Sequence, residues 1–207
     1  MNKNVAVAIA LVVVFIAGVA GYFVITSQEA PAPAASMPEA PPAPLPAAGT
    51  FEGPVQFALN DIDGNLRNLS EWQGKARLIN FWATWCAPCR REIPLLKQTQ
   101  ADHEADNVQV IGIAVDFPDE VRAYAEETQF NYPILVGQED AMAAAEDAGV
   151  PFIGLPFTMI VAPTGELINS HVGEIMESHI DTILAVLDEL ESGSMDLAAA
   201  REALSSL

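Results

Sequence analysis

The sequence predicts an α/β domain with a central mixed sheet flanked by helices and an N-terminal β-hairpin, preceded by a transmembrane helix and a Pro/Ala-rich linker. Two observations predict the class of the domain. Short apolar runs such as 76–82 and 108–115 suit buried strands. Longer segments such as 118–130 and 178–190 place apolar residues at helical spacing. This alternation is typical of a sheet with helices packed on it.

The composition limits the class of function. The chain has 207 residues and a formal net charge of -19, from 28 acidic and 9 basic side chains. Binding to nucleic acid or to an anionic lipid surface needs clustered Lys and Arg, so this charge argues against both. We therefore expect no nucleic-acid partner. The length suits one folded domain once an anchor and a linker are set aside.

Residues 1–26 are predicted to be a transmembrane anchor. Residues 5–25 carry no charge and, as a helix rising about 1.5 Å per residue, would span about 30 Å, the thickness of a bilayer core. Lys3 precedes this stretch and no basic residue follows until Arg67, which places the N-terminus in the cytoplasm and the domain outside it. A cleaved signal peptide is the alternative, but its apolar region is usually only about 7 to 15 residues long.

Residues 27–50 are predicted to be a stiff linker. They hold seven prolines and eight alanines, a composition that favours extended polyproline-like backbone and cannot bury a core. At about 3.1 Å per residue, the segment would reach as far as roughly 70 Å. Such a spacer would let an anchored domain reach different partners.

The domain is predicted to cover 51–192, followed by a C-terminal tail, 193–207, that includes a predicted helix. Asp63-Gly64 is a typical hairpin turn, and Pro94 is expected to kink the helix that contains it. The predicted strands are 55–59, 66–69, 76–82, 108–115, 132–136, 157–162 and 167–172. The predicted helices are 92–103, 118–130, 139–148 and 178–190.

The two cysteines of the chain, Cys86 and Cys89, directly follow the predicted strand 76–82 and lie at the start of a helix. Free N–H groups and the positive dipole end at a helix N-terminus stabilise a thiolate, so Cys86 is predicted to have a lowered pKa and to be the nucleophile. Cys89 can then attack a mixed disulfide at Cys86 and release the partner reduced. The sequence therefore predicts a redox-active disulfide, Cys86–Cys89, and no other cofactor.

The residues next to the cysteines are predicted to contact a partner. Trp85 offers an apolar rim, Pro88 restricts the backbone without breaking the helix start, and Ala87 lies beside it between the cysteines. Trp82 is predicted to pack beneath the loop. A zinc site and an inert cysteine pair are the alternatives. Zinc needs four protein ligands, and the three histidines lack the spacing that would complete such a site, so no metal is expected.

The string FWATWCAPCRREIP at 81–94 closely resembles the membrane-anchored thioredoxin-like reductases of the TlpA and ResA type. Several separated motifs in the same order make this resemblance specific. It implies a thioredoxin-like fold over about residues 51 to 190. The further matching motifs are Asp-Ile-Asp-Gly at 61–64, Gly74-Lys75, and Leu-Pro-Phe-Thr at 155–158.

The resemblance also implies roles for residues outside the cysteine motif. Leu155 and Pro156 match the family's cis-proline loop, whose backbone pairs with a bound partner, so both are expected to contact substrate. Glu92 matches an active-site glutamate that relays the proton of the resolving cysteine, and a plain helix-surface acid is the alternative. Asn80 stands where thioredoxin has a buried aspartate, which leaves Glu92 as the carboxylate for this transfer. The loop at 150–155 is longer than in the shortest family members.

By this resemblance, we expect a single-pass protein of the bacterial inner membrane with its domain in the periplasm. It would take electrons from a transmembrane thiol reductant and reduce protein disulfides, for example in apocytochrome c during cytochrome c maturation. The direction stays open, because potentials in this fold run from about -270 mV to about -120 mV. The alternatives are a thiol oxidant or isomerase, a thiol peroxidase, and a non-catalytic module that binds cysteine-bearing chains.

Overall fold

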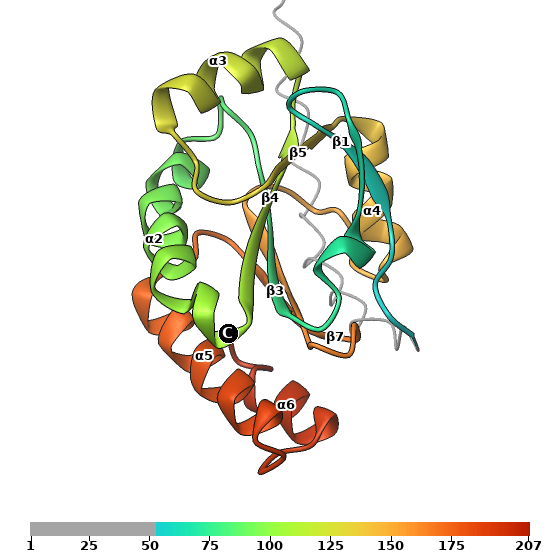
Figure 1. The fold of residues 1–207 in the computed structure, drawn as a ribbon, viewed down its shortest axis with the longest axis vertical. Coiled ribbons are helices and arrows are strands. Elements are labelled where there is room, and N and C mark those ends of the chain that lie inside the picture. Colours follow the sequence, from blue (N-terminus) through green and yellow to red (C-terminus); the bar gives the residue numbers. More distant parts are fainter. Residues whose placement is uncertain (1–52) are drawn as a thin grey trace, which may run out of the picture. The chain divides into compact units, whose positions relative to one another are not determined.

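A computed structural model describes residues 53–207, so the predicted anchor, 1–26, and the predicted linker, 27–50, lie outside the described residues. The described residues form a seven-stranded sheet with helices on both faces (Figure 1). The strands lie in the order β2-β1-β5-β4-β3-β6-β7. Their bounds are β1 (Ala58–Asp61), β2 (Leu66–Asn68), β3 (Ala76–Trp82), β4 (Val108–Val115), β5 (Ile134–Gly137), β6 (Phe157–Val161) and β7 (Leu167–Val172).

The helices α2, α3 and α5 pack on one face of the sheet, and α4 packs on the other (Figure 1). Two short 3-10 helices, η1 and η2, follow β2 and α2. None of the helices between residues 53 and 207 is both long and apolar enough to cross a membrane. The helical bounds are η1 (Leu69–Trp72), α2 (Ala87–His103), η2 (Glu104–Asp106), α3 (Pro118–Thr128), α4 (Glu139–Asp147), α5 (Glu177–Glu191) and α6 (Leu197–Ala203).

The central strands divide the core into two clusters. Every residue of β3 is buried, because helices cover both of its faces. Successive side chains of a strand point to opposite faces, so Leu78 and Val110 join the cluster under α2 and α5, whereas Ile79 and Ile111 join the cluster under α4. The continuous apolar runs of β3 and β4 therefore reflect burial on two sides.

The topology brings three loops to one edge of the sheet. Strand β3 is parallel to β4, so the residues that follow these two strands lie at the same edge. Strand β6 is antiparallel to β3 and starts beside its end, with Phe157 paired to Phe81. Three segments therefore lie together at this edge of the sheet: the cysteine motif, the loop after β4 and the segment before β6.

Most predicted elements are confirmed, and the ranges of β3, β4 and β7 agree residue for residue. The predicted start of the first strand at Val55 is wrong, because the Val55 N–H bonds to the Gly165 carbonyl, away from the hairpin. The predicted end of the third helix at Phe130 is also wrong. That helix ends at Thr128, because Gln129 adopts the left-handed conformation with φ of 52°.

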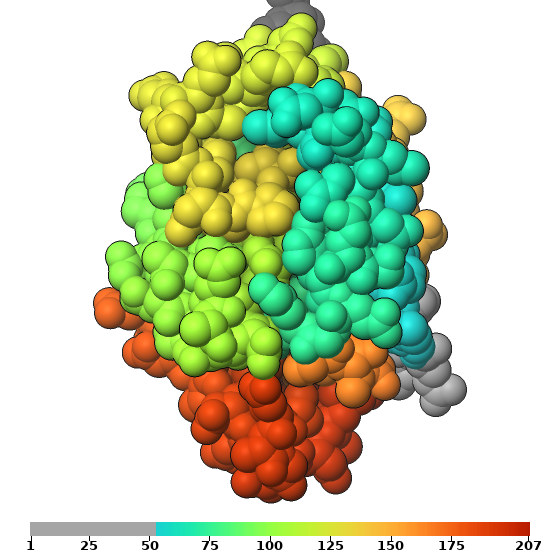
Figure 2. Space-filling model, viewed as in Figure 1, coloured from blue at the N-terminus to red at the C-terminus, as the bar shows by residue number. Residues whose placement is uncertain are grey.

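The C-terminal residues pack against the domain. Helix α6 lies within the predicted tail, 193–207, and Asp196 caps its first turn by accepting from the Ala199 N–H at 2.8 Å. Arg201 donates to the Leu167 carbonyl of β7, and Leu204 is fully buried. Helices α5 and α6 together form one end of the domain (orange to red in Figure 2).

Candidate active site

The cysteine pair lies where β3 passes into α2. Cys86 and Cys89 form a disulfide, and Cys86 is the N-cap of α2. Its Sγ accepts a hydrogen bond from the Cys89 N–H at 3.3 Å, while Pro88 in the first turn has no N–H to offer. Cys86 is 5% exposed and Cys89 is 0% exposed, so Cys86 is the cysteine that retains some contact with solvent.

The loop before Cys86 is held by Asp116, the residue that follows β4. The Asp116 carboxylate accepts from the Thr84 N–H at 2.9 Å and from the Thr84 hydroxyl at 2.6 Å. Its other oxygen accepts from the Phe117 N–H at 2.8 Å. Sequence reasoning missed Asp116, although an acid directly after a strand parallel to β3 was a usable signal. The residue fixes the position of two loops at once.

The loop before β6 lies beside the same edge. The Leu155–Pro156 peptide bond is cis, as the resemblance implied. Pro156 is buried, and its carbonyl accepts from the Gly173 N–H at 2.9 Å in the loop after β7. Leu155 is partly buried against both core clusters. The structure thus brings Leu155 and Pro156 to the edge that carries Cys86.

Glu92 is buried on α2, one turn after Cys89, with 1% exposure. Its Oε1 accepts from Asn80 Nδ2 at 2.8 Å, and its Oε2 accepts from the Ile175 N–H at 2.7 Å. Residues three positions apart on a helix share a face, so the carboxylate and Cys89 point to the same side of α2. The helix-surface alternative for Glu92 is therefore wrong.

The pKa of Glu92 is raised to about 7. Burial is the largest cause, since it disfavours the charged carboxylate. The hydrogen bonds from Ile175 and Asn80 oppose this effect, and the charge of Glu174 adds to it. A carboxyl group with this pKa can both take up and release a proton near neutral pH.

Exposed apolar side chains lie on the segments that come together at the edge of the sheet carrying the disulfide. Trp85 is 70% exposed immediately before Cys86, and Phe117 is 62% exposed immediately after Asp116. Ile153 precedes the cis-proline, and Met176 follows the loop that contacts Glu92, and both are about half exposed. Trp82, by contrast, is fully buried, as predicted. An apolar rim of this kind suits contact with another polypeptide.

The predicted contact residues inside the motif are also accessible. Ala87 is exposed, and Pro88 is partly exposed in the first turn of α2. Arg91 points to the neighbouring loop, where it bonds to the carboxylate of Glu174. This contact ties α2 to the segment that donates the Ile175 N–H, so it supports the position of Glu92.

Comparisons with known proteins find relatives that are named as thiol-disulfide oxidoreductases or as thioredoxin-like. A ResA thiol-disulfide oxidoreductase of Geobacillus kaustophilus is 31% identical over 112 residues, which cover 54% of this chain and 62% of the relative. The chain thus spans less than two thirds of that relative. The thioredoxin-like protein YneN of Bacillus subtilis is 32% identical over 121 residues, which cover 56% of this chain and 68% of the relative.

Solved structures show the same fold. A putative DsbE thiol:disulfide interchange protein of Chlorobium tepidum has a TM-score of 0.57 at 26% identity, covering 64% of this chain and 93% of that one. A secreted thiol-disulfide isomerase of Corynebacterium glutamicum has a TM-score of 0.58 at 25% identity, covering 65% of this chain and 84% of that one. Residues 52–170, more than half of the chain, match the AhpC/TSA family. The chain therefore belongs to the AhpC/TSA family, with a thioredoxin-like fold and relatives of the ResA type.

Proposed function

We propose that this chain is a thiol-disulfide oxidoreductase that reduces protein disulfides through Cys86 and Cys89. The placement of the disulfide carries this proposal. Cys86 caps a helix N-terminus, receives the Cys89 N–H and lies at an apolar rim, while Cys89 is fully buried behind it. These are the requirements of a nucleophile and a resolving thiol. The names of the ResA relatives support the same chemistry.

The reaction exchanges one disulfide for another. In the reduced enzyme, the Cys86 thiolate attacks a disulfide sulfur of the partner, which forms a mixed disulfide and releases the first partner thiolate. The Cys89 thiol then loses its proton and attacks Cys86 Sγ. This step re-forms the Cys86–Cys89 disulfide and releases the second partner thiolate. The enzyme loses two electrons, and the two released partner thiolates gain them and take up protons.

Glu92 is the proposed proton acceptor for Cys89. Its carboxylate is buried on the same face of α2, and its pKa of about 7 suits transfer near neutral pH. A return of this proton to a leaving partner thiolate would complete the cycle. Cys86, Cys89 and Glu92 are therefore the proposed catalytic residues.

The rim is the proposed partner-binding surface. Trp85 and the first turn of α2 present side chains beside the reactive sulfur, and the cis-proline loop borders it. An extended partner segment would lie across this edge with its cysteine over Cys86. The proposed contact residues are Trp85, Ala87, Pro88, Leu155 and Pro156.

The direction of the reaction and the location are further parts of the proposal. The uncharged stretch at 5–25 and the proline-rich segment 27–50 support an anchored, extracytoplasmic domain. In that oxidising setting, a reductase needs a transmembrane thiol reductant as its donor, and apocytochrome c is one proposed acceptor. No cofactor besides the cysteine pair is proposed.

A trapping experiment tests the activity. Cys89→Ser in the full-length chain removes the resolving thiol, so we expect stable mixed disulfides between Cys86 and cysteine-bearing extracytoplasmic proteins. The matched control Cys86→Ser is expected to trap none, because Cys89 is buried. Equal trapping by both variants, or by neither, would contradict the assignment. Rapid consumption of peroxide by the wild type would favour a thiol peroxidase instead.

The reduction potential tests the direction. We would equilibrate the full-length chain with defined dithiothreitol or glutathione ratios and measure the fraction in the disulfide form. A value near or below about -250 mV supports a reductase. A value above about -150 mV would identify an oxidant or an isomerase.

A further inference from the structure

A buried polar atom next to Glu92 has no hydrogen-bond partner. Asn80, on β3, donates from Nδ2 to Glu92 Oε1 at 2.8 Å and to Thr158 Oγ1 at 3.0 Å. The other end of the same amide, Asn80 Oδ1, is buried and accepts no hydrogen bond from any described residue. Buried acceptors without a partner are few in native proteins, and each calls for an explanation.

The two oxygens of Glu92 meet different kinds of donor. Oε2 accepts from the backbone N–H of Ile175, which is fixed in direction by the chain. A proton on Oε2 would take one lone pair of that oxygen and make it a poorer acceptor for the N–H, which is fixed in place. Oε1 instead faces a side-chain amide. When Glu92 is neutral, its proton therefore belongs on Oε1.

The Asn80 amide can adapt to that proton. A half-turn about its terminal side-chain bond exchanges Nδ2 and Oδ1 with almost no change in shape. Oδ1 then accepts from the Glu92 O–H. The Thr158 hydroxyl, which can donate as well as accept, then donates to the same Oδ1. The amide makes these two hydrogen bonds in either orientation, and the turn places the two Nδ2 hydrogens where Oδ1 now lies. The O–H of neutral Glu92, which needs an acceptor, is what favours the turned orientation.

We propose that Asn80 is a positioning residue that turns its amide with the protonation of Glu92, donating from Nδ2 to the carboxylate and accepting at Oδ1 from the carboxylic acid. Oε1 of Glu92 then keeps a hydrogen-bond partner in both states, while Glu92 carries the proton from Cys89 and after Glu92 has released that proton. Asn80 Oδ1, which has no partner in the present structure, is the acceptor when Glu92 is protonated. The link to Cys89 rests on the proposed function, whereas the turn itself occurs in the oxidised protein too.

Of the other ionisable groups near Glu92 and Asn80, His171 is buried on β7 directly opposite Thr158, so the Glu92→Gln variant is used to separate its effect from that of Glu92. The remaining groups do not account for such a change. Glu174, in the loop after β7, is bonded to Arg91. Burial, and then the charge of Glu92, raises the pKa of Tyr132 far above its usual range, so the phenol stays neutral. Cys89 is held in the disulfide in the oxidised chain. Glu92 is therefore the group whose titration Asn80 would report.

Nuclear magnetic resonance of the oxidised full-length chain in detergent micelles tests the turn. The Asn80 amide protons approach Thr158 and Glu92 only in the donating orientation. We expect nuclear Overhauser contacts from these protons to Thr158 at pH 9 and their loss at pH 5. Asn80→Leu assigns the signals, and in Glu92→Gln the contacts are expected not to change with pH. Contacts that persist at pH 5 in the wild type, while Glu92 titrates, would overturn the proposal.

The rate of the resolving step gives a second readout. Asn80→Leu removes both the donor and the acceptor, so we expect the rate at pH 7 to fall about tenfold and the pKa of Glu92 to rise by about 1. An unchanged pKa would mean that Asn80 merely joins β3 to β6. Should this variant fail to fold, Thr158→Val is expected to slow the step about threefold and Thr158→Ser to restore it. Equal rates in these two variants would contradict the role of the hydroxyl.

These readouts separate the two proposals. A pH-dependent turn in a protein that traps no partner would leave the Asn80 proposal standing and reject the oxidoreductase. An Asn80 amide that does not turn with pH, in a protein that traps partners at Cys86, would reject the Asn80 proposal and leave the oxidoreductase standing.

Discussion

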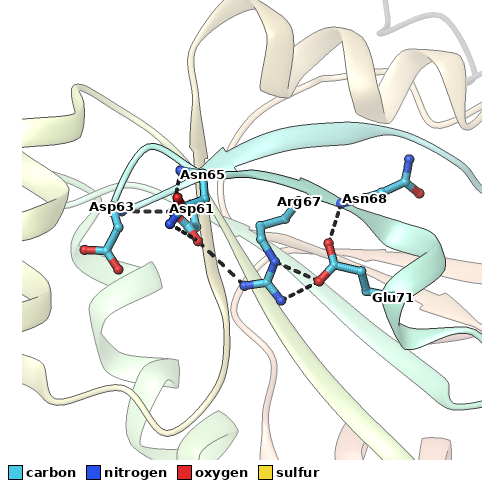
Figure 3. A network of polar contacts seen from close by, with 6 residues as sticks. All are labelled: Asp61, Asp63, Asn65, Arg67, Asn68 and Glu71. Carbon is cyan, nitrogen blue, oxygen red and sulfur yellow. Dashed lines mark hydrogen bonds and ion pairs between the residues drawn. The ribbon is translucent and has the colours of Figure 1, made fainter.

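Two polar networks in this domain place glutamates in opposite surroundings. In the β1–β2 hairpin and the helix η1 that follows it (Figure 3), Arg67 donates to Glu71 at 2.8 Å, and the Glu71 carboxylate also accepts from the Asn68 N–H. The same arginine lies 3.6 Å from Asp61. Beneath the disulfide, the partners of Glu92 are an amide and a backbone N–H, and none of its hydrogen-bond partners in the described chain is a cation.

These surroundings lower the pKa of Glu71 and Asp61 and raise the pKa of Glu92. The hydrogen bond from Arg67 holds the pKa of Glu71 below its ordinary value. Burial opposes ionisation of Asp61, but hydrogen bonds from Asn65 and Asp63 outweigh it and lower its pKa. Burial raises the pKa of Glu92 to about 7. A paired surface acid thus stays ionised and serves the local structure, whereas a buried acid without a cation can exchange its proton near neutrality.

The largest expected effect is on the rate of the resolving step, which should depend on Glu92 and not on Glu71. Glu92→Gln removes the proposed proton acceptor, so we expect the resolving step to slow by about 100-fold or more at pH 8. Glu71→Gln changes only the hairpin and is expected to leave the rate unchanged. Stopped-flow measurement of the decay of a mixed disulfide at Cys86 checks both. Equal slowing in the two variants would remove the distinction between the networks.

The dependence of stability on pH should also differ between Glu92 and its glutamine variant. The folded protein retains the Glu92 proton up to a pKa of about 7, whereas the unfolded chain releases it near 4.5. The unfolded state therefore binds fewer protons between these values, and stability falls as pH rises through this window.

We expect the wild type to lose up to about 3 kcal/mol of unfolding free energy relative to Glu92→Gln between pH 4 and pH 8, at about 1.4 kcal/mol for each pKa unit. Urea unfolding of both oxidised proteins at several pH values measures this difference. A difference that stays constant with pH would mean that Glu92 has the same pKa in the folded and unfolded states, near 4.5.

Asp116 differs from both glutamates, because it is buried like Glu92 but its hydrogen bonds hold loops in place, as those of Glu71 do. Asp116→Ala leaves the Thr84 N–H and hydroxyl and the Phe117 N–H without their acceptor. We expect the free energy of unfolding to fall by about 2 kcal/mol. Asp116→Asn keeps one carbonyl oxygen and should lose less. A chemical denaturation series checks the order, and equal stability of all three proteins would show that these bonds contribute nothing.

The smallest expected effect belongs to the hairpin. Arg67→Met breaks the ion pairs with Glu71 and Asp61 in a partly exposed setting, where such pairs are weak. We expect the melting temperature to fall by about 1 to 4 °C, with no change in the rate of disulfide exchange. A large loss of exchange activity would show that the hairpin takes part in the chemistry.

Much of this arrangement could be predicted from sequence, because the deciding patterns are local. The buried run at 76–82 predicted β3, and the cysteines that follow it predicted that a helix begins at the motif. The range predicted for that helix, 92–103, was too short, because α2 already begins at Ala87. Pro156 required the resemblance, because it lies far from Cys86 in the sequence. Glu92 stands three positions after Cys89, the spacing of one helix face, but only the resemblance gave this acid a role in catalysis. The structure then placed both at the same edge of the sheet or on the same helix face as the cysteines.

Other parts could not be predicted, because they depend on contacts between distant segments. The Ile175 N–H meets Glu92 across 83 positions, and Asn80 meets Thr158 across 78. Asp116 meets Thr84 only because β3 and β4 are neighbours in the sheet. A single sequence shows the polar residues but not which of them become partners.

The pKa of Glu92 tests the central claim most directly. Carbon-13 labelling of the glutamate carboxyl groups in the oxidised full-length chain, with Glu92→Gln and Glu71→Gln as assignments, would give both midpoints in one titration. We expect a midpoint of about 7 for Glu92 and one below the ordinary value for Glu71. A Glu92 midpoint near 4.5 would mean that the buried carboxyl is ionised like a surface acid, and would contradict its role as the proton acceptor for Cys89.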